Sequence, residues 1–369
     1  MKVISILGIR PDWIKMKSVL NELDQRDLEH IIVHTGQHYS YNLDRIFFEQ
    51  LKIRQPDFHL DVGSGAQGQQ AARIIERSEK IIADEKPDFV IVFGDSNSSL
   101  AAIAAAKINV GVVHIEAGMR SFDWRMPEEK NKRIVDHVSN FLFVYTRWQR
   151  ENLLREGIPS GKIHVVGNPT VDIIRQVAAK ARSTRILSRL GLEEKKYFLV
   201  TAHRAENVDN KKSLVKILTS LKRVHKKYAK PIVCSLHPRT KERIERFNLS
   251  IPVGLEVYDP MGFLEFLDLE MNALCVITDS GTVQEETCIL KVPCVAIRVS
   301  TERPETVALR ASLVAGLEPS NVLSSVEIML RRKPNWKHPY GDGKTGRRIV
   351  DILERAKGWS PLNETLEEA

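Results

Sequence analysis

The sequence predicts an α/β protein with two doubly wound, Rossmann-like domains that face a cleft. Three observations support this fold class. Short apolar runs alternate with amphipathic segments, which is the pattern of strand–helix–strand units around a parallel sheet. The alternation stops in a charged stretch near the middle of the chain and then resumes as a second series. The length of 369 residues, with 43% hydrophobic residues, is enough for two cores.

Each expected strand is a short apolar run that ends in polar or turn-forming residues. In the first half these runs span 3–7, 29–34, 89–93, 110–115, 141–145 and 163–166. In the second half they span 197–201, 232–236, 255–258, 274–278 and 294–297. Amphipathic stretches between them, among them 67–83 and 100–107, are the expected helices.

The two series of strands set the expected domain boundaries. Residues 1–170 form the N-terminal domain and 171–345 the C-terminal domain, with the charged segment 182–196 as the candidate linker. Residues 346–369 are expected to form a helix that returns to the N-terminal domain, followed by an acidic tail.

Composition excludes several classes of protein. No stretch approaches the roughly 20 apolar residues of a membrane-spanning helix, and the start of the chain is interpreted as a strand rather than a signal peptide. The net charge is +8, but the basic residues are dispersed, so we expect no nucleic-acid partner. The cysteines show no metal-ligand spacing, which favours buried free thiols in the cytoplasm and no metal site. They are Cys234, Cys275, Cys288 and Cys294.

Acidic residues stand where three elements of the first domain begin or end. Asp95 follows the strand at 89–93, Glu116 follows the strand at 110–115, and Glu128 opens a helix. The carboxyl ends of strands in an open parallel α/β sheet meet in one crevice. We therefore expect three carboxylates to face one ligand, an arrangement that suits proton transfer.

Other polar residues of the first domain are weaker candidates. Arg10 opens a helix after the first strand and suits an anion, while Lys15 faces either the same crevice or solvent. Gln37 and His38 follow the second strand and either bind ligand hydroxyls or cap a helix. Residues 62–68 match the pattern G-x-G-x-x-G, but they do not follow the first strand, so we interpret them as a loop beside the crevice.

Polar residues gather in the same way in the second domain. His203 follows its first strand and His237 the next, and each either contacts phosphate or packs against the sheet. After the strand at 274–278, a Ser-Gly-Thr segment enters a helix whose free N–H groups suit a diphosphate. Helix capping explains the same residues and is compatible with that role. The further candidates here are Arg204, Ser280, Gly281, Thr282, Glu286 and Arg303.

Taken in order, these segments resemble the non-hydrolysing UDP-N-acetylglucosamine 2-epimerase family over nearly the whole chain. The resemblance is carried by 8–12 with Lys15, 35–38, 94–95, 114–118, 127–129, 201–204, 278–281, 284–286, 301–305 and 340–343. Each segment is short, but so many in one order are specific. The resemblance implies a homodimer with the glycosyltransferase-B fold, in which the C-terminal domain holds the nucleotide and the sugar faces the N-terminal domain.

The resemblance also implies a reaction. Family members invert C2 of a UDP-linked 2-acetamido sugar without NAD or another cofactor, by eliminating UDP to a 2-acetamidoglucal and adding it back. Interconversion of UDP-N-acetylglucosamine (UDP-GlcNAc) and UDP-N-acetylmannosamine (UDP-ManNAc) is the leading hypothesis. The alternatives are a related UDP sugar, either a 2,3-diacetamido-uronic acid or a 6-deoxy-L-hexosamine, and a glycosyltransferase of the same fold.

The roles of individual residues follow from the resemblance. It implies that Asp95, Glu116 and Glu128 transfer protons, while Arg10, Lys15 and His203 stabilise the diphosphate. Ser280 binds phosphate, Glu286 binds ribose and His237 lines the same cleft. Residues 120–125, beginning with Arg120, are the expected discriminators between UDP sugars.

This chain departs from the family pattern at several positions. The usual Gly-Thr-Arg-Pro-Glu is Gly-Ile-Arg-Pro-Asp, and the usual Ser-Gly-Gly ends in Thr282. Lys132 stands where Arg is usual, which removes the planar guanidinium fork from a ligand contact. Tyr39 replaces the Arg of Gln-His-Arg, so the resemblance does not extend to activation by a second bound substrate.

Overall fold

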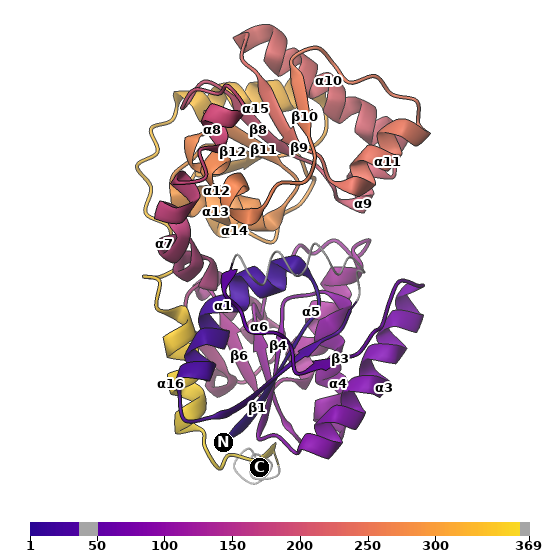
Figure 1. Cartoon of the computed structure of the whole chain (residues 1–369), viewed down its shortest axis with the longest axis vertical. Coiled ribbons are helices and arrows are strands. Elements are labelled where there is room, and N and C mark those ends of the chain that lie inside the picture. The colour runs from indigo at the N-terminus through magenta and orange to yellow at the C-terminus, as the bar shows by residue number, and fades with distance from the viewer. Residues whose placement is uncertain (37–50, 362–369) are drawn as a thin grey trace. The chain divides into compact units, whose positions relative to one another are not determined.

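The structure, a computed structural model, describes residues 1–36 and 51–361. The chain divides into two compact units, each built around its own parallel sheet (Figure 1). Unit 1 comprises Met1–Ile173 and Tyr340–Ala369, and unit 2 comprises Ile174–Pro339. The predicted class, α/β with two Rossmann-like domains, is confirmed. Which unit holds the nucleotide stays a prediction.

Unit 1 contains a seven-stranded parallel sheet. Its strands are β1 (Lys2–Leu7), β2 (Glu29–His34), β3 (Phe58–His59), β4 (Phe89–Phe93), β5 (Gly111–Ile115), β6 (Phe141–Val144) and β7 (Ile163–Val165). They lie in the order β3-β2-β1-β4-β5-β6-β7. The central strands β4 and β5 are buried throughout, because helices cover both faces of a parallel sheet. This is why these strands are nearly continuous apolar runs in the sequence.

Helices and short 3₁₀ turns connect the strands of unit 1. They are α1 (Arg10–Gln25), α3 (Gln67–Glu85), η1 (Asn97–Leu100), α4 (Ala101–Lys107), α5 (Pro127–Val138), α6 (Arg147–Arg155), η2 (Ser160–Lys162) and α16 (Thr345–Arg355). The last helix, α16, lies against α1 (Figure 1). A side chain at Gly346 would place its Cβ 2.7 Å from the backbone of Ser18, so this approach requires glycine. Arg26 ties the pair together through Asp351 and Glu354.

Unit 2 contains a six-stranded parallel sheet. Its strands are β8 (Phe198–Thr201), β9 (Ile232–Ser235), β10 (Leu255–Tyr258), β11 (Cys275–Thr278), β12 (Cys294–Ala296) and β13 (Ser312–Val314). They lie in the order β10-β9-β8-β11-β12-β13. Its helices are α8 (Ile186–Arg189), α9 (Ala205–Val208), α10 (Lys211–Tyr228), α11 (Pro238–Arg246), α12 (Phe263–Asn272), α13 (Gly281–Leu290), α14 (Pro304–Ala308) and α15 (Pro319–Arg331). Helix α7 (Pro169–Arg182) crosses the boundary between the units.

The predicted linker at 182–196 is wrong, because this segment belongs to unit 2. It contains α8, whose Ile186 is buried in a core cluster of unit 2, and Leu190 packs against the same cluster. The high charge of the segment conceals these apolar contacts. The chain instead passes between the units within α7 and again at residues 339–340.

The four cysteines are free and buried in unit 2, as the sequence predicted. Burial raises the pKa of the Cys234 and Cys294 thiols to about 12, so neither forms a reactive thiolate near neutral pH. Within residues 1–36 and 51–361, no helix is long and apolar enough to cross a membrane.

Candidate active site

The predicted residues of unit 1 gather where the strand order reverses. Successive strands run outward from β1 in one direction and from β4 in the other, so the switch point lies between β1 and β4. Open α/β sheets bind ligands at the carboxyl ends of strands at such a point. Gly8 follows β1 there, and a side chain at this position would place its Cβ 1.7 Å from Oγ of Ser98. Only glycine lets the two loops meet so closely.

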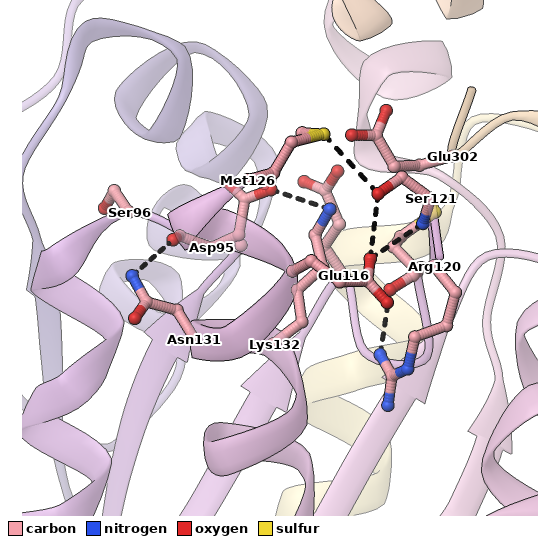
Figure 2. Close-up of polar contacts among 12 residues, drawn as sticks. Asp95, Ser96, Glu116, Arg120, Ser121, Met126, Asn131, Lys132 and Glu302 are labelled. Carbon is pink, nitrogen blue, oxygen red and sulfur yellow. Dashed lines mark hydrogen bonds and ion pairs between the residues drawn. The ribbon is translucent and has the colours of Figure 1, made fainter. Parts of the chain in front are cut away.

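Asp95 lies at the carboxyl end of β4 and is paired with α5. Lys132 Nζ lies 2.8 Å from Asp95 Oδ2, and the neighbouring Asn131 donates to the backbone oxygen of Asp95 at 3.0 Å (Figure 2). The lysine is buried, whereas the Asp95 side chain is partly exposed. The carboxylate is therefore accessible but held by a fixed positive charge. Lys132 was predicted to contact the ligand, and its observed partner is Asp95.

Glu116 lies at the carboxyl end of β5 in a strained conformation. Its φ of 75° is in the left-handed region, which costs a non-glycine residue on the order of 1 kcal/mol or more. Its backbone N–H donates to the Phe143 oxygen, which holds the turn in place. Glu116 Oε2 lies 3.3 Å from Lys15 Nζ and accepts from the Tyr145 hydroxyl at 3.3 Å. Lys15, 2% exposed, thus faces the acid and not solvent, which answers the question left open by the sequence.

Asp12 is a third acid at this switch point, and the sequence reasoning did not include it among the site residues. It is 3% exposed, and its Oδ2 accepts from the backbone N–H groups of Gly8 and Ile9 at 3.2 and 3.1 Å. Burial raises its pKa to about 7; the two backbone bonds oppose this, and the charges of Asp95 and Glu116 add to it. The available signal was its position three residues before Lys15, on the same face of α1.

We expect Asp12→Asn to remove a pH dependence of stability. The folded pKa of about 7 lies above the ordinary value of 3.8, so the contribution of Asp12 is complete below pH 4 and is lost as pH rises through 7. Since a tenfold change in proton affinity is about 1.4 kcal/mol, the wild type loses on the order of 4 kcal/mol over this range. Asparagine keeps the oxygen that accepts from Gly8 and Ile9 and carries no charge. Melting temperatures from pH 5 to 8 test this, and parallel curves for the two proteins would contradict it.

Glu128 and Arg10 stand in the first turns of two helices at this edge. Glu128 follows Pro127 in α5 and is half-buried, and Lys132 lies four residues later on the same helix face. Arg10 is the first residue of α1 and is exposed. The predicted ligand residues Gln37 and His38 lie outside the residues that the structure describes.

Arg120 has a different environment from the one predicted. Its guanidinium is fully buried and lies 2.7 Å from Asp136 and 2.6 Å from Glu156. Asp136 also accepts from Gly118 N and lies 2.7 Å from His114 Nδ1. Through these contacts, Arg120 and Asp136 stabilise the turn that carries Glu116. We therefore revise its expected role from contact with the ligand to support of this turn.

The predicted residues of unit 2 gather at the matching switch point, between β8 and β11. Buried Asp279 accepts from the backbone N–H groups of His203 and Arg204 at 3.0 Å each and from Asn207 Nδ2 at 3.0 Å. The His203 and His237 rings lie next to each other, tilted by 31°, with 5.3 Å between their centroids. Asp279 therefore fixes the loop after β8, leaving the His203 side chain 38% exposed at the edge.

The start of α13 combines capping and close packing. The Ser280 hydroxyl accepts from the backbone N–H of Val283, so Ser280 is the N-cap of this helix. A Cβ on Gly281 would lie 3.2 Å from the guanidinium carbon of Arg303. Arg303 is itself buried and donates to Glu285 at 2.6 Å, which indicates that it supports this helix start. Thr282, which follows Gly281, is half-buried.

Glu286 lies in the second turn of α13 and is only 4% exposed. Its charge acts on the carboxyl group of Glu270 of α12, which is fully buried. Burial, followed by the charge of Glu286, raises the pKa of Glu270 well above its ordinary value.

Among the described residues, unit 1 places carboxylates beside lysines at its switch point, and unit 2 places a helix N-terminus and histidines at its own. This suits proton transfer and binding of an anion. Within residues 1–36 and 51–361, no cluster of three or more His, Cys, Asp or Glu side chains has metal-site geometry.

Comparison with known proteins identifies the family. A family model described as UDP-N-acetylglucosamine 2-epimerase matches residues 21–354. A UDP-N-acetylglucosamine 2-epimerase from Methanocaldococcus jannaschii is 46% identical, covering 97% of this chain and 100% of that protein. A UDP-2,3-diacetamido-2,3-dideoxy-D-glucuronate 2-epimerase from Pseudomonas aeruginosa is 40% identical, covering 96% and 100%.

A solved structure leads to the same family. The crystal structure of the M. jannaschii UDP-GlcNAc 2-epimerase in complex with UDP-GlcNAc and UDP matches with a TM-score of 0.92 at 45% identity. The match covers 96% of this chain and 100% of that chain. Together with the family match over most of the sequence, this shows that the chain belongs to the UDP-N-acetylglucosamine 2-epimerase family.

Proposed function

We propose that this protein inverts C2 of a UDP-linked 2-acetamido sugar and interconverts UDP-GlcNAc and UDP-ManNAc. The observation that carries the proposal is the pair of acids at the β1/β4 switch point. Asp95 and Glu116 each lie against a lysine there, at 2.8 and 3.3 Å. The proposal includes a homodimer in the cytoplasm and a reaction that needs no cofactor.

The chemistry explains why more than one acid is needed. A carboxylate takes the C2 proton, the electron pair of that C–H bond forms the C1–C2 double bond, and the C1–O bond breaks with its pair on UDP. UDP then adds back to C1 while a second acid delivers a proton to the opposite face of C2. Two groups of opposite protonation state must therefore stand on the two faces of the sugar.

We assign the roles by unit. Asp95, Glu116 and Glu128 of unit 1 exchange the C2 proton, and Lys15 and Lys132 keep Glu116 and Asp95 in place. Unit 2 binds UDP, with the β-phosphate at the start of α13 and the ribose at Glu286. The groups assigned to the charge of the departing diphosphate are Arg10, His203, Arg204, His237, Ser280 and Thr282.

A neutral sugar is favoured over the uronic acid that the P. aeruginosa relative is named for. A C6 carboxylate needs a cation, and the predicted discriminator segment begins with Arg120. The Arg120 guanidinium is fully buried between Asp136 and Glu156, so it is not positioned to bind a uronate. The other arginine of the segment, the exposed Arg125, is paired with Asp123. This supports a C6 hydroxymethyl group, as in UDP-GlcNAc.

Turnover in D2O tests the reaction. We expect deuterium at C2 of both UDP-GlcNAc and UDP-ManNAc, because the acid that delivers the returning proton has exchanged it with solvent. Mass spectrometry and proton NMR detect the label. A parallel incubation with the UDP-2,3-diacetamido-uronic acid should be slower by at least tenfold. Epimers without deuterium would reject the mechanism, and equal rates would reject the substrate assignment.

A further inference from the structure

An unbroken chain of amide hydrogen bonds leads away from Asp95 in unit 1. Asn131 of α5 donates one N–H to the Asp95 backbone oxygen at 3.0 Å (Figure 2). It donates the other N–H to Asn97 Oδ1 at 3.1 Å. Asn97 in turn donates to the side-chain oxygens of Gln67 and Gln70 at 2.8 and 3.0 Å. Five polar groups are thus linked, and they come from α3, η1, α5 and the turn after β4.

The far end of this chain of hydrogen bonds fixes the orientation of its side-chain amides. Gln70 donates its amide N–H to the Gly63 backbone oxygen at 2.9 Å. Both ends, Asp95 O and Gly63 O, are backbone oxygens that only accept, so each amide has one self-consistent orientation. Rotating the Asn97 amide would set its oxygen against the oxygen of Gln70, and Gln70 cannot turn without losing Gly63. The chain therefore holds its members in one arrangement.

This chain of hydrogen bonds ends on the part of α5 that carries Glu128 and pairs with Asp95. The residue after Asn131 is Lys132, which pairs with the Asp95 carboxylate at 2.8 Å, so α5 holds both the main chain and the side chain of Asp95. Glu128 lies three residues before Asn131 on the same helix. A shift of Asn131 would therefore move Asp95 and Glu128 relative to each other.

We propose that Asn97 and Asn131 are positioning residues, whose amide chain holds Asp95 and Glu128 in register for the two proton transfers at C2. This inference rests on the proposed function. Neither amide exchanges a proton with the sugar. Their contribution is geometric, and a displacement of about 1 Å at reacting groups costs up to about 100-fold in rate.

Steady-state kinetics of Asn97→Ala and Asn131→Ala test the proposal. We expect kcat to fall about 10- to 100-fold with KM within threefold of wild type, because the substrate-binding groups remain. The ratio of free UDP released to epimer formed should also rise. Without a well-placed second acid, the glycal that elimination produces is not protonated at C2. The double variant should be no slower than the slower single variant, since both break one chain.

Asn140→Ala is the matched control. Asn140 is also a half-buried asparagine of unit 1, but its Oδ1 accepts from Val112 N at the opposite, amino-terminal edge of β5. Its loss should lower the melting temperature to a similar extent with kcat and UDP release unchanged. Additive effects in the double variant, or a kcat for Asn97→Ala equal to that of Asn140→Ala, would overturn the inference. A wild-type protein without C2 exchange would instead reject the proposed function.

Discussion

Glu128→Gln should lower kcat by about 100-fold or more while the protein stays folded. Glutamine has the size of glutamate and the same helix propensity, but it cannot take or give a proton at C2. Glu128 stands in the first turn of α5, where a negative charge favours the helix, so its loss should cost at most about 1 kcal/mol. Initial rates at saturating UDP-GlcNAc, with circular dichroism as the folding check, measure both effects.

Glu151→Gln provides the control for this substitution. Glu151 is an exposed glutamate of α6, far along the chain from the proposed acids, and its replacement should leave kcat unchanged. A Glu128→Gln protein with wild-type kcat would remove Glu128 from the proton-transfer set. The assignment of Asp95 and Glu116 would then have to account for both faces of the sugar.

Asp136→Ala should destabilise unit 1 by about 3–5 kcal/mol. Asp136 is fully buried and accepts from Gly118 N, and it pairs with His114 and Arg120, whose side chains are also fully buried. Alanine would leave these donors without their acceptor in a site with no solvent. Denaturant unfolding measures the loss. Glu29→Ala, which removes an exposed partner of Lys2, should cost less than about 1 kcal/mol.

The Asp136 carboxylate also makes the free energy of unfolding sensitive to acid. Burial alone would raise the pKa of Asp136, but His114 and Arg120 outweigh burial and hold this pKa below its ordinary value. The contribution of Asp136 is therefore complete above pH 4 and is lost as pH falls through its folded pKa. An unfolding free energy for Asp136→Ala equal to that of Glu29→Ala would contradict this account.

The sequence predicted most strands well because of how a parallel sheet is buried. Strand β4 matches its predicted range, since continuous burial makes it a distinct apolar run. The strands β3 and β13 were not predicted. β3 is a two-residue exposed edge strand, and β13 has three residues with only Ser312 buried, so neither forms an apolar run.

The sequence predicted which strand ends carry the candidate site, but it did not predict which side chains contact each other there. Asp95 and Glu116 could be placed because topology brings the carboxyl ends of neighbouring strands together. The buried pairing of Arg120 with Asp136 and Glu156 could not be inferred, because these residues are separated along the chain and meet only through tertiary packing. Asp12 was missed for a related reason: its raised pKa follows from burial, which one sequence does not display.

The sheet of unit 1 is built from one continuous segment, but its covering helix α16 comes from the other end of the chain. Unit 2, residues 174–339, is thus inserted into unit 1. During synthesis the second unit emerges whole and can fold before the first is complete, which reverses the usual N-terminal-first order. The side of α1 that packs against α16, at Ser18, stays uncovered until the ribosome has released residues 345–355. A chain cut short before residue 345 would leave that side exposed to aggregation.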